Sequence, residues 1–387
     1  MNIAFVTHKF GKGDGQGRVN YEVVWEALRQ GHHVTLLAGE VAEDLQAHPR
    51  VTTILFPVAH YPSALLQNHF FALRTSQWLK THRAELDFIQ VNGAITFGPT
   101  DLNAVHFVHS AWLRSPVHTA RLQRSLAGLY QWLYTSWNAR LERKAFADAR
   151  CVVAVSEQVR CDLLEIGVPD HKIRVILNGV DLDEFRPGPA SRHELGVPEG
   201  VPLAFFAGDI RTPRKNLDTV LHALVDVPGV HLIVAGTVEG SPYPALSSRL
   251  GLAERVHFLG FRRDIAHLMR AADLFAFPSR YETCGLVILE ALASGLPVIT
   301  ARTAGGANVV TPGCGVVLAD PNDTAALTAA FHLILADTEH RRRMGLAARS
   351  EAEKYSWNRM ACEYLAVAEQ INTYAVTTHV CHSEALP

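Results

Sequence analysis

The sequence lacks the marks of several common classes of protein. Its six cysteines include no CxxC pair and follow no metal-ligand spacing, so we predict neither a disulfide framework nor a metal site. The formal net charge is only −2, which argues against a nucleic-acid partner. No apolar run reaches the roughly 18 residues of a membrane span, and the N-terminus does not resemble a signal peptide. We therefore expect a cytoplasmic protein, and the sequence does not indicate its oligomeric state.

The residues that are present indicate a large α/β protein. The chain of 387 residues suffices for two ordinary domains, and 48% of its residues are hydrophobic. Short apolar runs alternate with helical segments, which predicts parallel sheets covered by helices on both faces. The predicted strands are residues 2–7, 33–38, 51–56, 87–93, 105–109, 151–156 and 173–179 in the first half and 202–208, 231–236, 256–260, 274–279 and 297–300 in the second.

A proline-rich segment separates the two halves. Residues 181–202 contain four prolines among glycines and charges, a composition typical of an interdomain linker. We predict two doubly wound, Rossmann-like domains, 1–180 and 181–355, facing a central cleft. Ligands of such sheets bind beyond the carboxyl ends of the strands, so the loops that follow the strands are the candidate sites.

The first of these loops is rich in glycine. Gly15 and Gly17 precede a helix predicted to begin near Arg18, so the backbone could approach a ligand at the helix N-terminus. The dinucleotide fingerprint GxGxxG is not satisfied, because Arg18 stands where its third glycine belongs, and a dehydrogenase is therefore disfavoured. A plain turn is the equally common alternative.

The first strand of the second half is followed by a basic turn. Arg211, Arg214 and Lys215 come just before an amphipathic helix that we expect to begin near Asn216. Three cations beside a helix N-terminus suit a diphosphate. A solvated basic turn explains the same spacing equally well.

Two glutamates flank a third candidate element, YETCGLVILEALASG (281–295). Gly285 is expected to end a strand-to-helix turn, so Glu282 would lie in a loop and Glu290 inside a helix that runs from Gly285 or Leu286 to Ser294. The two acids could be solvated surface groups. Glu290 argues against this, since its flanks are apolar and a buried carboxylate needs polar partners such as sugar hydroxyls.

Taken together, these motifs resemble the retaining GT-B glycosyltransferases of glycosyltransferase family 4. The acid-x7-acid motif after a strand ending in Pro-Ser is fairly specific, and the match covers nearly the whole chain. The last matching segment is similar to the terminal helix that returns to the N-terminal domain in this family, so we assign about 356–373 to the first domain. The segments that carry the resemblance are the glycine loop, 142–156, 175–185, 211–215, 278–299 and 355–371.

The resemblance implies a hexosyltransferase that takes a UDP- or GDP-sugar, without a cofactor or a catalytic metal. Glu282 would contact the donor sugar, and Glu290 the ribose hydroxyls. Lys215 would neutralise the departing diphosphate, and His109, with His106 as the alternative, would lie near the donor sugar. The anomeric configuration would be retained, with the donor phosphate taking the proton of the acceptor, which is a glycan, a lipid-linked group or a small molecule. The other residues implied to bind the donor are Gly15, Gly17, Arg211, Arg214, Thr283, Cys284, Gly285 and Leu286, with Arg262 bordering the base.

The chain departs from the family pattern at two places. Asp209 stands where the family often has an arginine, so the sequence does not tell which arginine supplies that charge. Ala307 and Asn308 replace the usual Pro-Glu in a loop that lies near the donor in the family. Both changes leave the acid pair and Lys215 intact.

Two other functions remain open from the sequence. A nucleotide-sugar epimerase of the same architecture would need no acceptor, and a nucleotide-sugar-binding protein would catalyse nothing. A leucine stripe with two tryptophans in residues 122–146 could touch a membrane that holds a lipid acceptor. Core packing explains such a stripe more often, and we expect it here.

Overall fold

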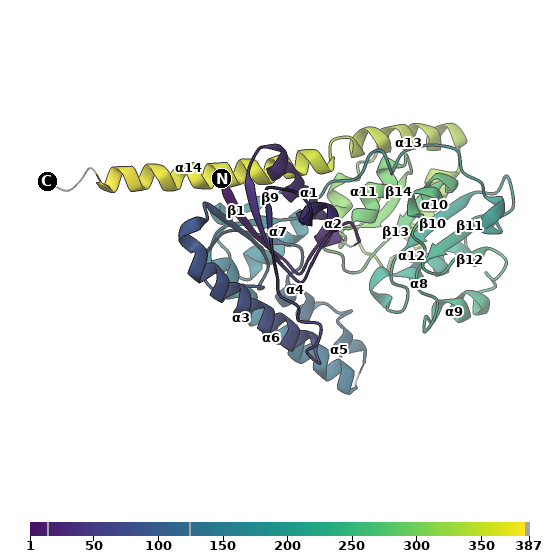
Figure 1. Ribbon diagram of the computed structural model, residues 1–387. Coiled ribbons are helices and arrows are strands. Elements are labelled where there is room, and N and C mark those ends of the chain that lie inside the picture. The colour runs from purple at the N-terminus through teal and green to yellow at the C-terminus, as the bar shows by residue number, and fades with distance from the viewer. Residues whose placement is uncertain (14, 124, 384–387) are drawn as a thin grey trace. The chain divides into compact units, whose positions relative to one another are not determined.

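The chain folds into two compact units. The computed structural model describes residues 1–13, 15–123 and 125–383, with side chains to residue 373 (Figure 1). The first unit is Met1–Asn178 together with the segment from Trp357 onward, and the second is Gly179–Ser356. Each unit contains one large parallel sheet with helices packed against it, so the predicted fold class of two doubly wound α/β domains is confirmed.

The sheet of the first unit has seven parallel strands in the order β5-β3-β1-β6-β7-β8-β9. Its strands are β1 (Asn2–Val6), β3 (His33–Ala38), β5 (Val51–Leu55), β6 (Phe88–Asn92), β7 (Thr100–Val105), β8 (Ala149–Ala154) and β9 (Ile173–Val175), and a separate pair is formed by β2 (Lys9–Phe10) and β4 (Glu40–Val41). Its helices are α1 (Gly15–Arg29), α2 (Glu43–Gln46), α3 (Ala64–His82), α4 (His109–Arg114), α5 (Thr119–Leu122), α6 (Leu126–Asp148), α7 (Glu157–Glu165) and α14 (Trp357–Ser383).

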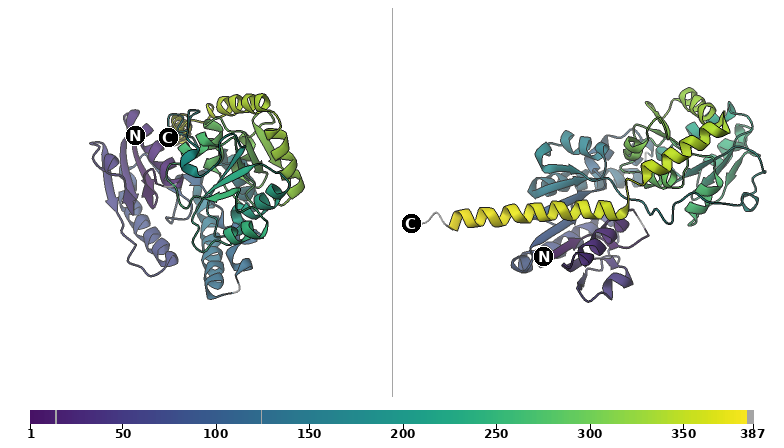
Figure 2. Two further views of the ribbon diagram at one scale, coloured as in Figure 1. Left: turned by 90° about the vertical axis from the view of Figure 1, so that its right-hand side faces the viewer. Right: turned by 90° about the horizontal axis from the view of Figure 1, so that it is seen from above.

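Side chains of β1 alternate between two cores, one on each face of the sheet. Ile3 and Phe5 pack with α1 and α14, whereas Ala4 and Val6 pack with α3. This alternation follows from the two-residue period of a strand. Tyr364 of α14 is fully buried in the first of these cores, so the last helix completes the N-terminal unit. It extends beyond the predicted 356–373 and is the long yellow helix of Figure 2.

Two predicted boundaries in this unit are wrong. The expected strand 105–109 lies earlier, at Thr100–Val105, and His109 instead begins α4. Polar residues obscured this strand in the sequence, but they are buried with backbone partners. Asp101 accepts from the backbone N–H of Ile89 at 2.9 Å, and Asn103 from that of Gly93 at 2.7 Å. Helix α1 also begins at Gly15 rather than near Arg18.

The sheet of the second unit has six parallel strands in the order β12-β11-β10-β13-β14-β15. Its strands are β10 (Leu203–Ala207), β11 (His231–Ala235), β12 (Val256–Phe258), β13 (Leu274–Phe277), β14 (Val298–Ala301) and β15 (Gly315–Leu318), the last of which was not predicted. Its helices are α8 (Leu217–Val225), α9 (Tyr243–Arg249), α10 (Ile265–Ala271), α11 (Leu286–Ala293), α12 (Thr324–Leu335) and α13 (Thr338–Ala352). The strand order reverses between β10 and β13, which is where doubly wound sheets bind ligands.

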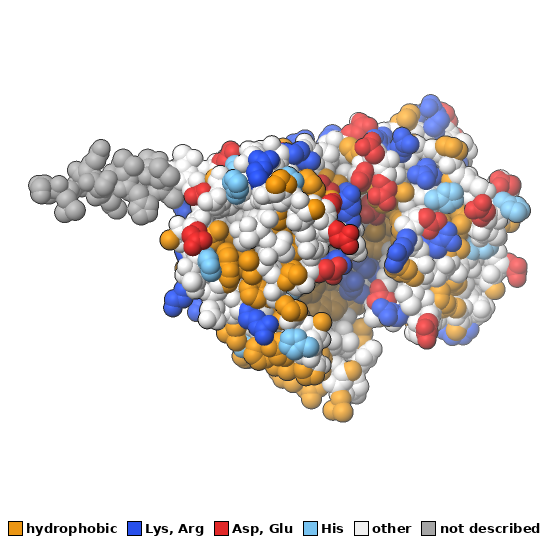
Figure 3. All heavy atoms as spheres, in the orientation of Figure 1, with side chains coloured by type: hydrophobic (Ala, Val, Ile, Leu, Met, Phe, Trp, Pro, Cys, Tyr) orange, Lys and Arg blue, Asp and Glu red, His pale blue; other side chains and the backbone are white. Residues whose placement is uncertain are grey.

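The leucine stripe of 122–146 does not pack in the core, so that expectation is wrong. Leu126 of α6 is 86% exposed, and Trp132 and Trp137 are also exposed. Polar residues such as Thr135 and Glu142 fill the buried face of this helix instead. Apolar side chains gather over α3 and α6 on the face seen in Figure 3. Among the described residues, each helix is too short or too polar to span a bilayer.

Candidate functional site

A buried asparagine fixes the basic turn that follows β10. Asn216 has a φ of 68°, the one positive φ outside glycine in the described chain, a conformation that asparagine tolerates better than most residues. Its side-chain amide donates to the carbonyl oxygens of Pro278 at 2.8 Å and Pro321 at 2.6 Å. The turn is thereby tied to the loop that follows β13. Sequence reasoning placed the start of a helix near Asn216 but missed this role.

Arg280 provides a second set of bonds between the same two loops. Its backbone N–H donates to the carbonyl of Arg214 at 2.9 Å, and its guanidinium to the carbonyl of Pro213 at 2.8 Å. The guanidinium also grips the carboxylate of Asp218 in α8. The basic turn is therefore held rigidly at the carboxyl end of the sheet, next to the central strand β10.

Lys215 and Glu282 meet in an ion pair at the place where the two loops join. Their side chains are only 12% and 14% exposed, and Arg214 lies 3.9 Å from the same carboxylate. The ammonium group also sits 5.0 Å from the centroid of the Phe277 ring. The structure thus brings together three of the residues predicted from the sequence, Arg214, Lys215 and Glu282.

Burial and charge act in opposite directions on this pair. Burial alone would raise the pKa of Glu282, but the charges of Lys215 and Arg214 outweigh it and hold the pKa below its usual value. Burial lowers the pKa of Lys215, and Glu282 opposes that change. A cation held in a desolvated place interacts strongly with any negative charge brought next to it.

The loop that contains Ala307 and Asn308, in place of the family's usual Pro-Glu, forms backbone hydrogen bonds with Glu282. The backbone of Glu282 pairs with Thr303 and Gly305, and the N–H of Gly305 donates to the Glu282 carbonyl at 2.8 Å. A side chain at Gly306 would place its Cβ 2.7 Å from the Cys284 carbonyl oxygen, so only glycine fits there. This loop therefore positions the acidic loop through its backbone.

The division of the acidic stretch into loop and helix is confirmed. Gly285 has a φ of +71° and precedes α11, which begins at Leu286. Glu282, Thr283 and Cys284 lie in the loop and are partly buried. Glu290 lies in the second turn of α11 and is also partly buried, so it is not a freely solvated acid.

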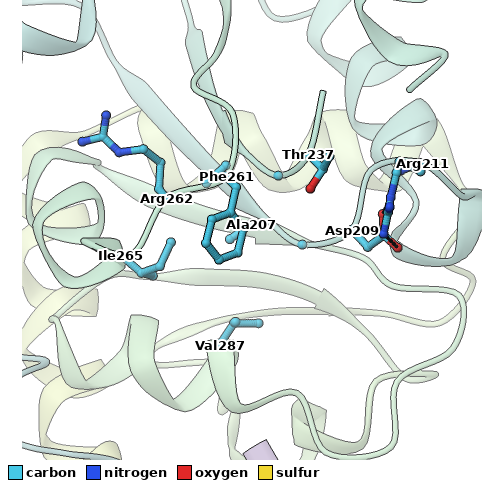
Figure 4. Close-up of a pocket in the computed structure, with 11 residues that line it drawn as sticks. Ala207, Asp209, Arg211, Thr237, Phe261, Arg262, Ile265 and Val287 are labelled. Carbon is cyan, nitrogen blue, oxygen red and sulfur yellow. Dashed lines mark hydrogen bonds and ion pairs between the residues drawn. The ribbon is translucent and has the colours of Figure 1, made fainter. Parts of the chain in front are cut away.

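A cavity of about 400 Å³ opens next to this site. The cavity lies at the carboxyl ends of strands β10 and β11. Figure 4 shows Phe261, Ile265 and Val287 around it. Gly208 also lines the cavity and lies close to the Lys215 side chain. A Cβ added at this glycine would lie only 3.1 Å from Cγ of Lys215. Val287 precedes Glu290 by three residues, so both lie on one face of α11. The cavity has the size of a ligand site and is open to solvent.

Two of the predicted arginines are already engaged at the rim of this cavity. Arg211 is bound by both oxygens of Asp209, the acid that stands where the family often has an arginine, at 2.9 and 3.1 Å. Arg262 is likewise bound by Asp264 at 2.8 Å, and its guanidinium extends away from Phe261 in Figure 4. Both arginine side chains are more exposed than that of Lys215, so water screens their charges more strongly.

The remaining predicted residues lie in the first unit. Gly15 and Gly17 occupy the first turn of α1, within the helix rather than in a loop before it. His109 begins α4, and its Nδ1 lies 3.0 Å from the Glu142 carboxylate. The two oxygens of Glu142 also accept the backbone N–H groups of His109 and Ser110, each at 2.8 Å. Glu142 thus caps α4 and orients the His109 ring.

Glu142 was missed as a functional residue. It is 1% exposed, although the sequence places it in the long α6 among basic residues that suggest a solvated face. The only signal was its place at the start of 142–156, a segment already noted for its resemblance to the family. Its role depends on a partner 33 residues away, which no local pattern shows.

Replacing Glu142 with glutamine is expected to destabilise the first unit by about 2 kcal/mol. The amide keeps one acceptor but turns an NH₂ group toward an N–H donor, so a charge-assisted bond is lost. Calorimetry should show a decrease of about 4–8 °C in the Tm of this unit. Glu165 pairs with Arg114 on the surface, so Glu165→Gln is the matched control and should change Tm by less than about 1 °C. An unchanged Tm for Glu142→Gln would show that the cap is not formed.

A second cavity, of about 250 Å³, lies in the first unit. It sits beyond the ends of β1 and β6, where the strand order of the first sheet reverses. His109 and His106 both line it. Among the described residues, no group of three or more histidine, cysteine or acidic side chains could hold a metal ion.

Comparison with known sequences assigns the two units to two family descriptions. Residues 13–184 match "Glycosyltransferase Family 4", and residues 189–351 match "Glycosyl transferases group 1". A D-inositol 3-phosphate glycosyltransferase from Nocardia farcinica is 35% identical over 233 residues, which are 56% of this chain and 51% of that protein. One from Xylanimonas cellulosilytica is 34% identical over 246 residues, 59% of each. The chain thus aligns with between half and three fifths of these relatives.

Solved structures show the same fold at lower identity. Sucrose-phosphate synthase from Thermosynechococcus elongatus has a TM-score of 0.77 at 22% identity, covering 96% of this chain and 99% of that one. Anabaena HepE in complex with UDP and glucose has a TM-score of 0.69 at 23% identity, covering 94% and 99%. These similarities show the GT-B fold.

Proposed function

Because the chain belongs to glycosyltransferase family 4, with a group 1 glycosyl transferase region, we propose that it transfers a hexosyl group from a nucleoside-diphosphate sugar to a hydroxyl acceptor. The observation that carries the proposal is the buried Lys215–Glu282 pair at the switch point of the second sheet, next to a cavity of ligand size. UDP is the first nucleotide to test as part of the donor, because Anabaena HepE was solved with UDP and glucose.

In this proposal the positive charges act on the leaving diphosphate. Breaking the bond to the sugar builds negative charge on the phosphate oxygen, and a cation fixed in advance stabilises that charge in the transition state. Lys215 lies against Gly208 in a turn that Asn216 fixes, and Arg214 lies beside it, which supports this role. These side chains would do the work that a metal ion does in other transferases, so we propose a metal-independent reaction.

The acidic residues would hold the sugar and the ribose. Glu282 would turn one carboxylate oxygen to the sugar hydroxyls while the other stays with Lys215, which positions the sugar against the cationic group. Glu290 would accept hydrogen bonds from the ribose hydroxyls. It lies about one turn of α11 after Val287, which lines the cavity. Phe261 and Ile265 supply an apolar surface for the base.

We further propose that the anomeric configuration is retained. His109 would lie near the donor sugar with its Nε2 available, because Glu142 engages Nδ1. The donor phosphate would take the proton from the acceptor hydroxyl on the face from which the diphosphate leaves.

The direct test is the thermal stability of the chain with UDP, GDP, ADP and their sugars. One nucleoside diphosphate at about 100 times its Kd should stabilise the second unit by about 2.7 kcal/mol. Its Tm should rise by about 5–10 °C. The same nucleotide should stabilise Glu290→Ala far less, because the ribose loses its acceptor. Glu339→Ala, on the surface of the same unit, should respond like the wild type. If no nucleotide changes the Tm of the wild type, the proposal fails.

A further inference from the structure

Eight of the thirteen residues that line the cavity of the first unit are histidines, side-chain amides or a tyrosine, and the others are glycine or apolar. His8 follows β1, Asn92 ends β6, and His106 follows β7, so three neighbouring strands deliver hydrogen-bonding groups to one place. Helices α3 and α6 close it with further amides and a phenol. Its polar side chains are His8, Gln16, Asn68, Asn92, His106, His109, Tyr134 and Asn138.

Charged residues do not line this cavity. Among the residues that the structure describes, its lining contains no lysine, arginine, aspartate or glutamate. Glu142 is buried and contacts His109, one of the lining residues, through Nδ1. A negatively charged ligand would therefore find no cation in these walls and would face a carboxylate beyond them.

Three of the lining side chains have unused hydrogen-bonding capacity. Nε2 of His8, Nδ2 of Asn92 and Nε2 of His106 are buried without a hydrogen-bond partner among the described residues. An unsatisfied buried polar atom is destabilising, so a ligand group that reaches one of these atoms and supplies a partner gains affinity. Burial lowers the pKa of His106 to about 4 and lowers that of His8, so both rings are neutral at pH 7.

We propose that this cavity binds an uncharged, polyhydroxylated part of the acceptor, and that the chain discriminates against a phosphorylated one. The proposal rests on the proposed transferase function and names the acceptor class for it. A sugar or cyclitol hydroxyl both donates and accepts, which suits neutral imidazoles and amides that can do either. A phosphate binds best to arginine or lysine, and these walls contain neither, although Gln16 brings the first turn of α1 to the cavity.

The experiment compares matched pairs of acceptors that differ by one phosphate group. The relatives described above are named for D-inositol 3-phosphate, so myo-inositol and this phosphate form one pair. Glucose with glucose 6-phosphate, and mannose with mannose 6-phosphate, form two more. Binding to the full chain saturated with its nucleoside diphosphate is measured by saturation-transfer NMR and calorimetry, and transfer by mass spectrometry of the products. At least one neutral sugar or cyclitol should bind ten times more tightly than its phosphate.

Two kinds of variant test which residues impose this choice. Asn92→Leu and His106→Phe remove one hydrogen-bonding partner each, and each should weaken the binding of the neutral acceptor about tenfold. Asn68→Lys adds a cation to the wall and should shift the preference at least tenfold toward the phosphorylated member. His60→Leu, on the surface of the same unit, is the control and should change neither. Calorimetry verifies that the first unit of each variant is folded.

The outcomes separate this inference from the function on which it rests. If a nucleoside diphosphate binds but each phosphorylated acceptor is preferred over its neutral partner, the inference is overturned and the transferase proposal stands. The same conclusion follows if no neutral acceptor in the panel binds. If no nucleotide binds at all, the transferase proposal itself fails. An unchanged preference in Asn68→Lys would show that the acceptor does not occupy this cavity.

Discussion

Replacing Lys215 with alanine is expected to lower kcat about 100- to 1000-fold, the typical cost of removing one group that stabilises developing charge in a transition state. The ammonium group is buried, fixed by an ion pair and supported by a turn that Asn216 ties to the sheet. Such a group does not have to reorganise when the diphosphate leaves. Donor KM should rise much less than kcat falls, because the ground state carries less of this charge. Initial rates of transfer with a saturating acceptor measure both quantities.

Lys354→Ala is the matched control for this prediction. Lys354 lies in the same unit and also pairs with a glutamate, but on the surface, where its side chain is 55% exposed. Its removal should change kcat by less than about twofold, since its own ammonium group is exposed and its charge is screened by solvent. Lys215→Arg keeps the positive charge but changes the shape of the group, so its kcat should lie between those of Lys215→Ala and Lys354→Ala. A kcat for Lys215→Ala within tenfold of the wild type would exclude Lys215 from the chemistry.

Replacing Glu282 with leucine alone is expected to destabilise the second unit by about 3–5 kcal/mol. The substitution leaves the ammonium group of Lys215 in a site that is largely closed to water and without its counter-charge. Removing both charges, as Lys215→Met with Glu282→Leu, should restore the stability to within about 1 kcal/mol of the wild type. The double variant should nevertheless be inactive. Calorimetry and transfer assays on the wild type, on Lys215→Met and Glu282→Leu alone, and on the double variant complete a double-mutant cycle.

The same pair predicts an acid dependence of stability. The pKa of Glu282 is lower in the folded chain than its ordinary value of 4.5, so the stabilisation it provides is fully present above that value. It is lost as the pH falls through the lower, folded pKa. The double variant has no such group and should lose less stability than the wild type below about pH 4.5. If the two proteins lost stability in parallel on acidification, the ion pair would not be a source of stability.

Much of the fold could be predicted from the sequence because the evidence for it is local. The buried parallel strands are continuous apolar runs, and the prolines of 181–202 interrupt them. Gly285 revealed the break between loop and helix because glycine is the residue that adopts a positive φ at little cost. Strand β7 was misplaced because its buried polar residues are satisfied by backbone groups of β6 and the loop that follows it.

The sequence by itself determined the two α/β domains and, through residues next to strand ends, the candidates Lys215 and Glu282. Only the tertiary structure decided that these two charges meet, since they come from loops 67 residues apart that join where the strand order reverses. It also decided that Glu142 is buried and that the leucines of α6 are not, because the partner of a helix face is set by packing. Local sequence fixes what each residue can do, and the sheet order fixes which residues do it together.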